Sequence, residues 1–274
     1  MTRGALVTGG GTGIGAAVAL RLAADGFAVT ICGRTESKLR EAADRIRSTL
    51  GDEAAVRPVV ADVTVEADVE RLVATAVEHA GRLDAVVANA GGGGGLAPYH
   101  LQDAAEFIRV LQLNVVGTML LAKHTLPHLI SGGGGSFVGM SSIAAGTTHP
   151  YFGAYPVAKA GIDQLMRNAA DEYGYANVRF NAVRPGFIAT EIMQAIPKES
   201  ATYASYVDNT AVPRLGEPSD VAALCSFLVG PDSTWITGQV INVDGGHSLR
   251  RGPDYGPFLE PVFGAEAMRP TASQ

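Results

Sequence analysis

The sequence predicts one α/β domain in which a parallel sheet carries helices on both faces. Short apolar runs alternate with longer amphipathic runs along most of the chain, the pattern of repeated βαβ units. The short runs show no polar alternation, so their strands are expected to be buried on both faces. The length of 274 residues is enough for one large domain with a well-buried core.

The elements follow one another in a regular order. The predicted strands are residues 5–8, 28–32, 56–61, 84–89, 136–140, 178–183 and 239–243. The predicted helices are residues 13–24, 36–50, 65–79, 102–111, 115–130, 155–173 and 218–228. We therefore assign residues 1–249 to a single domain. Residues 250–274 are rich in Pro, Gly and aromatic residues, and they are expected to form an extended arm packed on the domain or on a neighbouring subunit.

Composition excludes several classes of protein. The net charge of −6 and the absence of a long basic run argue against nucleic-acid binding. Cys32 and Cys225 are too far apart in sequence to suggest a metal site, and two cysteines favour a reducing, cytoplasmic location. No run of ~20 apolar residues is present, so no membrane span is expected. The chain enters its first strand almost at once, so no signal peptide is expected.

A glycine-rich loop follows the first predicted strand and precedes the first helix. Glycines permit a tight turn and a close approach of the backbone to a pyrophosphate. The helix that follows presents its first N–H groups and the positive end of its dipole. The loop reads Thr8-Gly9-Gly10-Gly11-Thr12-Gly13-Ile14-Gly15. This placement predicts a dinucleotide site.

The end of the second strand predicts NADP(H) rather than NAD(H). An acidic residue here usually binds the ribose hydroxyls of NAD, but this chain has Gly33 followed by Arg34. The glycine leaves room for a 2′-phosphate, and the arginine supplies a permanent forked cation. Asp62, at the end of the third strand, is placed to accept a hydrogen bond from the adenine amino group. The segment 91–95, five glycines after a strand, is also expected to meet a ligand.

Tyr155 and Lys159 form the central candidate pair for catalysis. Residues four apart share one face of a helix and can touch. A tyrosine titrates near ~10, and a nearby positive charge favours the phenolate, which predicts a lowered pKa and an acid/base role. Many surface helices contain such a pair by chance, so the surrounding motifs decide its meaning. Pro156 is tolerated in a first turn, so the helix is expected to begin close to Tyr155.

Together these motifs resemble the short-chain dehydrogenase/reductase (SDR) family. The matching residues are Thr8 to Gly15, Asn89-Ala90-Gly91, Asn114, Ser142, Tyr155-x-x-x-Lys159 and Arg184-Pro185-Gly186. The stretch from Gly238 to Gly246 is similar to the last strand of that family, and the resemblance covers about residues 3–246. It implies a three-layer Rossmann fold of about seven strands in the order 3-2-1-4-5-6-7. It also implies an enzyme that transfers hydride between a nicotinamide cofactor and a carbonyl or alcohol carbon.

The resemblance assigns roles to single residues. Ser142 would polarise the substrate carbonyl, with Ser141 as the alternative. Tyr155 would be the acid in reduction and the base in oxidation. Lys159 would lower the pKa of Tyr155 and bind the nicotinamide ribose, and Asn114 would order a water chain behind it. The expected cofactor-binding set is Gly9, Gly11, Thr12, Gly13, Ile14, Gly15, Arg34, Asp62, Val63, Asn89, Ala90, Gly91, Tyr155, Lys159, Pro185, Gly186, Ile188 and Thr190.

The resemblance also places a substrate lid at residues 187–212. Its apolar and aromatic side chains favour a hydrophobic carbonyl or alcohol, such as a 3-oxoacyl thioester, a steroid-like ring or another bulky compound. They are Ile192, Met193, Ile196, Tyr203, Tyr206 and Val207. Phe258, Leu259 and Phe263 of the arm could close the same pocket or that of a neighbouring subunit. The three histidines His100, His149 and His247 are interpreted as loop or surface residues, and Trp235 as a core or interface residue.

Three functions remain open from the sequence. The first is an NADP(H)-dependent alcohol dehydrogenase or ketoreductase, with NAD(H) possible. The second is an NADPH-dependent enoyl-thioester reductase, because the loop and Cys32-Gly33-Arg34 resemble some of those enzymes as well. The third is a cofactor-binding regulator without turnover, which the intact Tyr155 and Lys159 disfavour. A homotetramer or homodimer is expected, because the family commonly buries the helix from Tyr155 at a subunit interface.

Overall fold

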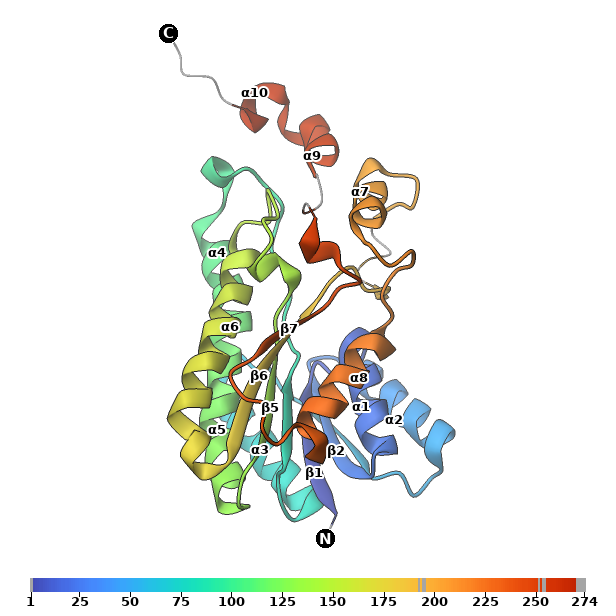
Figure 1. Ribbon diagram of the computed structural model, residues 1–274, viewed down its shortest axis with the longest axis vertical. Coiled ribbons are helices and arrows are strands. Elements are labelled where there is room, and N and C mark those ends of the chain that lie inside the picture. Colours follow the sequence, from blue (N-terminus) through green and yellow to red (C-terminus); the bar gives the residue numbers. More distant parts are fainter. Residues whose placement is uncertain (1, 192, 194–195, 251, 253–254, 270–274) are drawn as a thin grey trace.

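The apolar runs of the sequence form one sheet of seven parallel strands in the order β3-β2-β1-β4-β5-β6-β7 (Figure 1). The strands are β1 (Arg3–Thr8), β2 (Phe27–Gly33), β3 (Val56–Val60), β4 (Ala85–Ala88), β5 (Gly135–Met140), β6 (Val178–Pro185) and β7 (Val240–Val243). This computed structural model describes residues 2–191, 193, 196–250, 252 and 255–269. The predicted fold class and strand order are confirmed.

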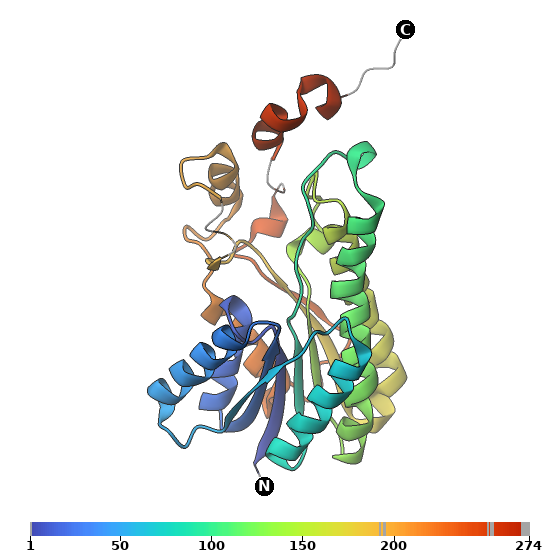
Figure 2. The same cartoon turned by 180° about the vertical axis from the view of Figure 1, so that it is seen from behind.

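Helices cover both faces of the sheet, as the sequence predicts. The helices are α1 (Gly13–Ala24), α2 (Glu36–Leu50), α3 (Glu66–Ala80), α4 (Ala104–Leu111), α5 (Gly117–Ser131), α6 (Ala154–Tyr173), α7 (Ala201–Asn209), α8 (Pro218–Val229), α9 (Gly256–Phe263) and α10 (Ala265–Met268). Val18 of α1, Leu39 of α2 and Val221 of α8 are buried in one core. Leu121 of α5 and Ile162 of α6 are buried in the core on the other face. Figure 2 shows the two layers from behind.

The strand order fixes where a ligand can bind. β1 pairs with β2 on one side and with β4 on the other, so the connections run in opposite directions from this point. Because every pair is parallel, the carboxyl ends of all strands lie at one edge. In an open α/β sheet the crevice at this edge, where the order reverses, is the usual ligand site. The loops after β1, β4, β5 and β6 meet there.

The two predicted helices at 102–111 and 115–130 are one continuous helical stretch. A π-helical turn, η2 (Gln112–Val116), joins α4 to α5 without a break. The whole stretch, Ala104–Ser131, is long and apolar enough to cross a membrane by length and composition. Its buried residues Leu121 and Leu129 belong to the core beneath the sheet, and α5 contacts α3 while α4 contacts α6. The apolar character is therefore used in part for packing within the domain.

The arm at 250–274 is not extended as predicted. Within its described part the chain forms α9 and the short α10, which lie beyond the carboxyl edge of the sheet (Figure 1). Pro257 stands in the first turn of α9, where its missing N–H costs nothing. Pro261 lies inside the helix, which ends two residues later at Phe263. The expectation that the arm packs on the domain is confirmed, because Tyr255 and Leu259 are buried.

Candidate active site

The glycine-rich loop after β1 has the conformation that close packing of backbone requires. Gly9 and Gly13 have φ angles of +65° and +52°, which side-chain-bearing residues rarely adopt. A Cβ on Gly15 would lie 2.1 Å from the Gly9 carbonyl oxygen. The first turn of α1 contains no acidic residue, so its N–H groups and dipole can face an anion. The predicted phosphate cradle therefore has the geometry that a pyrophosphate needs.

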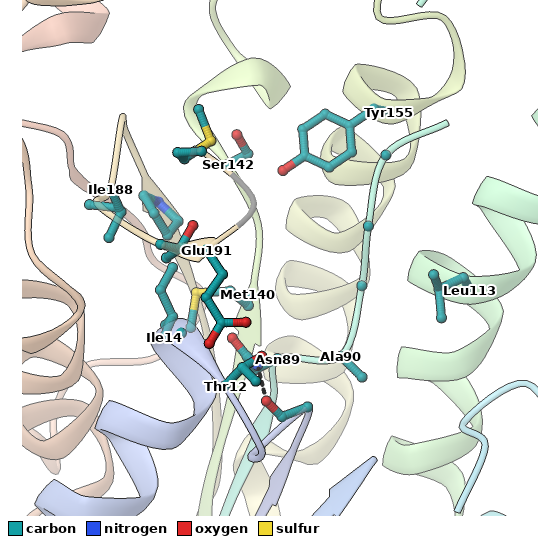
Figure 3. A pocket seen from close by; sticks show the side chains of 18 of the residues that line it. Thr12, Ile14, Asn89, Ala90, Leu113, Met140, Ser142, Tyr155, Ile188 and Glu191 are labelled. Atoms are coloured by element: carbon teal, nitrogen blue, oxygen red, sulfur yellow. Dashed lines mark hydrogen bonds between the residues drawn. The ribbon is translucent and has the colours of Figure 1, made fainter. Parts of the chain in front are cut away.

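A cavity of about 810 Å³ runs along the carboxyl edge from this loop to the C-terminal arm. Of the residues predicted to bind a cofactor, all line this cavity except Gly15, which supports the loop from behind. Figure 3 shows Thr12, Asn89 and Ala90 at one end of the cavity and Ser142 and Tyr155 at the other. The structure thus brings together side chains from the loops after β1, β2, β3, β4, β5 and β6.

The adenosine end of the cavity contains three side chains from the segment after β2. Arg34 lines it as predicted, together with Thr35 and Lys38, which the sequence reasoning missed. The Lys38 ammonium lies 3.6 Å from a carboxylate oxygen of Glu191, and both side chains are exposed. Asp62 lies just after β3, and one of its carboxylate oxygens accepts hydrogen bonds from the N–H and the hydroxyl of Thr64. This end therefore has one more cation than the sequence reasoning assigned to it, and Glu191 is the carboxylate that pairs with this cation.

Asn89 fixes the loop after β4 to the loop after β1. Its side-chain amide donates to the carbonyls of Thr8 and Gly9 at 3.0 and 3.2 Å. The Thr8 hydroxyl in turn accepts from the N–H groups of Asn89 and Ala90. The Asn89 side chain lines the cavity, but its amide holds the backbone in place. It is thus a positioning residue for the cradle.

Ser142 and Tyr155 point toward one another across the cavity (Figure 3). Ser142 lies two residues after β5 and caps the short helix η3 (Ile143–Ala145), where its hydroxyl accepts from the Ala144 N–H at 3.2 Å. Tyr155 is the second residue of α6, so the predicted start of this helix is confirmed to within one residue. Both side chains are half-buried. Two hydroxyls that face one space can bind the same oxygen atom.

Ser141 has a different place. Its hydroxyl donates to the Lys159 carbonyl at 3.0 Å, and the side chain is buried. It therefore ties β5 to the second turn of α6. The geometry favours Ser142 over Ser141 as the group that can meet a substrate.

The pKa of Tyr155 departs from the sequence prediction. Burial raises the pKa of the phenol, and the hydrogen bond with Ser142 lowers it in part. The Lys159 ammonium lies 5.5 Å from the centre of the Tyr155 ring. Desolvation is the largest cause of the shift, so the net change in the Tyr155 pKa is upward, opposite to the lowering that the sequence predicts.

Lys159 is a buried cation. Only 4% of its surface is exposed, and its ammonium donates to the Met140 carbonyl at 2.8 Å. Burial lowers its pKa to about 8, while Asp163 one turn later raises it. Asp163 is itself buried and accepts from the Arg184 guanidinium at 2.9 Å. The sequence reasoning missed Asp163, although its spacing of four residues from Lys159 on one helix could have shown it.

Asn114 lies in the π-helical turn, directly behind the glycine segment after β4. Its amide donates to the carbonyls of Val110 and Gly92, and its oxygen accepts from the Gly92 N–H at 3.3 Å. A Cβ on Gly91 would lie 2.6 Å from the Asn114 oxygen and 3.1 Å from the Lys159 ammonium. The predicted ligand contact of the glycine run is supported, since Gly91 to Gly94 line the cavity. π-helical turns are frequently found at functional sites.

The segment after β6 closes the cavity over its middle. Pro185, Gly186, Ile188 and Thr190 all line it. Ile188 pairs with Gly216, and this pairing uses the Phe187 carbonyl and the Ala189 N–H. The Ile188 N–H takes no part in this pairing, so it can donate a hydrogen bond to a ligand. Ile192, also assigned to the lid, lies outside the described residues.

Aromatic side chains form the remaining wall. Phe187 stacks on Tyr206 of α7 with ring centres 4.0 Å apart, and Tyr255 packs edge-on against Phe152 at 5.0 Å. Phe152 lies 6.1 Å from the Tyr155 ring, so this wall adjoins the reacting groups. The sequence reasoning missed Phe152. Of the three arm residues expected at the pocket, Phe258 lines the cavity, whereas Leu259 and Phe263 pack in the hydrophobic cluster with Phe187 and Tyr206.

Three isolated residues test the remaining interpretations. His149 and His247 are 7% and 0% exposed, so neither is at the surface, although His149 lies in a loop as predicted and lines the cavity. Gly252 of the C-terminal segment lies against His149, and the Tyr206 ring packs on His247. Trp235 is 99% exposed in the single chain, which excludes the core interpretation.

Comparison with known proteins agrees with this geometry. Residues 9–248 match a family model described as enoyl-(acyl carrier protein) reductase. The chain is 37% identical to the bovine protein "dehydrogenase/reductase SDR family member 4", covering 88% of this chain and 86% of that one. It is 36% identical to cis-4-hydroxycyclohexanecarboxylate dehydrogenase of Sinomonas cyclohexanicum, covering 90% and 96%.

Solved structures are similar over the whole fold. A short-chain type dehydrogenase/reductase from Mycobacterium ulcerans has 46% identity and a TM-score of 0.95, with 98% of each chain covered. A 7α-hydroxysteroid dehydrogenase complexed with NADH and 7-oxo glycochenodeoxycholic acid has 30% identity and a TM-score of 0.84, covering 89% of this chain and 93% of that one.

Proposed function

This chain is a member of the short-chain dehydrogenase/reductase family and an oxidoreductase of alcohol and carbonyl groups, and on this basis we propose a more specific reaction. It interconverts a secondary alcohol and a ketone on a hydrophobic substrate, with NADP(H) preferred. The observation that carries the proposal is the pair of facing hydroxyls, Ser142 and Tyr155, beside the buried ammonium of Lys159. The dinucleotide supplies or takes up the hydride when it is bound.

The proposed roles follow from where each group lies. The Ser142 hydroxyl donates to the substrate oxygen and holds it against Tyr155. In reduction the Tyr155 phenol gives its proton to that oxygen, and in oxidation the phenolate takes the proton back. Lys159 stabilises the phenolate that reduction leaves, because its positive charge lies on the same face of α6. Asn114 keeps the glycine segment and the space behind Lys159 in shape, which orients the reacting groups.

The preference for NADP(H) is supported by positive charge at the adenosine end. Arg34 and Lys38 line the cavity there, and Gly33 leaves the strand end without a carboxylate. A 2′-phosphate would gain charge-assisted hydrogen bonds from Arg34, and from Lys38 if Lys38 exchanges Glu191 for the phosphate. Measurement of kcat/KM with NADPH and NADH, for wild type and Arg34→Ala, tests this. A much higher value for NADH in the wild type would contradict the preference.

The hydrophobic substrate is supported by the aromatic wall. Phe152, Phe187, Tyr206, Tyr255 and Phe258 line the part of the cavity next to Ser142 and Tyr155. A pocket of this kind gains most of its binding free energy from apolar area removed from water. A screen of ketones, alcohols and thioesters with both cofactors, followed by nicotinamide absorbance, tests the reaction class.

An enoyl-thioester reductase is the second candidate, because the matching family model carries that description. The complete Ser142, Tyr155 and Lys159 set favours carbonyl chemistry over reduction of a carbon–carbon double bond. Rates on a 3-oxoacyl and on a 2-enoyl thioester separate the two. A higher rate on the enoyl compound would select the second candidate, and no turnover of either class would favour a cofactor-binding regulator.

We further propose a homotetramer, with a homodimer as the alternative. Helices α4, α5 and α6 expose apolar side chains on the surface away from the sheet, including Ile108, Met119 and Val157. Ile108 is 64% exposed, and together with Met119 and Val157 it gives these helices apolar surface that a second copy could remove from water. A second copy packed on these helices would cover these apolar side chains.

A reducing, cytoplasmic location is proposed from the two thiols. Cys32 and Cys225 are buried and unpaired with one another, and burial raises the pKa of each to about 12. The fold thus uses them as small apolar side chains. Recovery of the native protein from an oxidising compartment during cell fractionation would contradict this.

A further inference from the structure

Three polar side chains from separate segments meet in the aromatic wall of the cavity. His149 comes from the loop between β5 and α6, Tyr206 from α7, and Tyr255 from the C-terminal segment, and all three line the cavity. The Tyr206 and Tyr255 hydroxyls lie 3.4 Å apart. Phe152 packs edge-on against both His149 and Tyr255, at 5.3 and 5.0 Å between ring centres. None of the three has a part in the proton transfer assigned to Tyr155.

The hydrogen bonds of this group leave capacity for a ligand. The 3.4 Å between the two phenols exceeds the usual 2.5–3.0 Å of an O–H···O bond, so neither hydroxyl is saturated by the other. The His149 Nδ1 lies 2.8 Å from the Thr147 carbonyl, which can only accept, so Nδ1 carries the proton. In the neutral ring the other nitrogen, Nε2, is then an acceptor. Burial lowers the pKa of His149, which favours the neutral ring.

The charge around the three side chains constrains the ligand. Among the described residues of the cavity, the charged ones are Arg34, Lys38 and Asp62 at the adenosine end, Glu191 beside Lys38, and Lys159 behind Tyr155. The described part of the aromatic wall thus contains no ionised side chain. A carboxylate or phosphate placed there would lose its hydration without gaining a counter-charge. An uncharged oxygen can be bound by the phenols and the imidazole at no such cost.

We propose that His149, Tyr206 and Tyr255 form a second recognition point, which binds an uncharged hydroxyl or carbonyl oxygen of a cyclic substrate. The flat stacked pair of Phe187 and Tyr206 would pack against the ring, while the reacting oxygen would bind to Ser142 and Tyr155. The substrate class is therefore a neutral ring ketone or alcohol with a second oxygen. This inference rests on the proposed function and narrows its substrate.

The test compares three ring ketones in the reduction assay. Cyclohexanone has no second oxygen, cyclohexane-1,4-dione has a neutral one, and 4-oxocyclohexanecarboxylate has a charged one. The dione is expected to have a KM about 10-fold below that of cyclohexanone, since one neutral hydrogen bond changes affinity by about this factor. The keto acid is expected to gain nothing over cyclohexanone. A keto acid preferred over the dione would overturn the inference.

Variants test whether the Tyr206 and Tyr255 hydroxyls cause the lower KM of the dione. Tyr206→Phe and Tyr255→Phe are each expected to raise the KM of the dione about 5- to 10-fold with kcat nearly unchanged. Each variant removes a hydrogen bond that the bound substrate and the transition state make equally. The KM of cyclohexanone, which has no second oxygen, should rise much less than that of the dione. Tyr203→Phe is the matched control, since Tyr203 lies on the same helix and packs on Phe187 but does not line the cavity. Equal effects on dione and cyclohexanone would overturn the inference.

A binding measurement separates this inference from the proposed function. Calorimetry of the dione with cofactor-loaded Tyr155→Phe needs no turnover, and Tyr255→Phe in that background should weaken the Kd about 5- to 10-fold. If no ketone is reduced but the hydroxyl-dependent binding is present, the proposed reaction fails and the recognition point stands. If ketones are reduced but removal of either hydroxyl leaves the Kd of the dione unchanged, the proposed recognition point is wrong and the proposed reaction stands.

Discussion

Tyr155 depends on side chains that reach it from several elements. Ser142 comes from the segment after β5, Lys159 from the next turn of α6, and Asn114 from the π-helical turn. Gly91 lies between Asn114 and Lys159 and has no side chain to separate them. Each of these positions was found from its motif. Their chemical roles stay predictions until variants are measured.

The contact at Gly91 leads to a first prediction. Gly91→Ala places a methyl group 2.6 Å from the Asn114 oxygen and 3.1 Å from the Lys159 ammonium, so both must shift. We expect kcat/KM to fall by about 10- to 100-fold, since small displacements of positioned groups have effects of this size. Gly95→Ala is the control, because no atom lies within 4 Å of its added methyl group. Similar kinetics for the two variants would refute the packing argument.

Burial of Lys159 leads to a prediction about stability and pH. The folded-state pKa of about 8 is below the usual 10.5, so the burial cost is fully present below pH 8 and disappears as pH rises through 10.5. Lys159→Met removes that titration. Relative to wild type, the free energy of unfolding of the variant should thus decline by up to about 3 kcal/mol between pH 7 and pH 11. Urea titrations at several pH values measure it, and a difference independent of pH would contradict the buried cation.

At the scale of elements, the sequence pattern predicted features that depend only on neighbouring residues, such as where a helix begins. α6 begins at Ala154, close to the predicted start, because Pro156 is suited to a first turn. The pattern did not predict the docking of α9, since burial of Tyr255 and Leu259 depends on contacts with Phe187 and Tyr206, far away in sequence. His149 lies in a loop as predicted, but it is buried beside Phe152 and the distant Gly252 rather than exposed. Side chains that are buried by non-local segments leave no periodic signal.

The docking of α9 gives a further prediction. Leu259 is 4% exposed in the aromatic cluster, whereas Val262 on the same helix is 72% exposed. Leu259→Asp would bury an unpaired carboxylate, so α9 should detach and the wall of the cavity should lose Tyr255. The KM of a hydrophobic ketone should rise about 10-fold or more, with the Kd of the cofactor little changed. Val262→Asp is the control, and an equal rise in KM there would refute the role of the docked face.

At the scale of the whole molecule, the apolar helix Ala104–Ser131 connects the catalytic site to the surface. One side contacts α3 and α6, and the other exposes Ile108 and Met119. We expect Ile108→Glu together with Val157→Glu to shift the mass measured by light scattering from tetramer toward dimer or monomer. Leu249→Glu is the control, because Leu249 is also exposed but does not lie on α4, α5 or α6. A wild type that is already monomeric at micromolar concentration would contradict the assembly proposed for these helices.

The central claim is that the Tyr155 phenol transfers the proton to and from the substrate oxygen. Tyr155→Phe keeps the ring against Phe152 and removes only the hydroxyl. The direct measurement is single-turnover reduction of a ketone by the variant loaded with NADPH. We predict a rate at least about 100-fold below wild type with unchanged affinity for the cofactor, in line with usual general-acid contributions. A rate near that of wild type would contradict the mechanism.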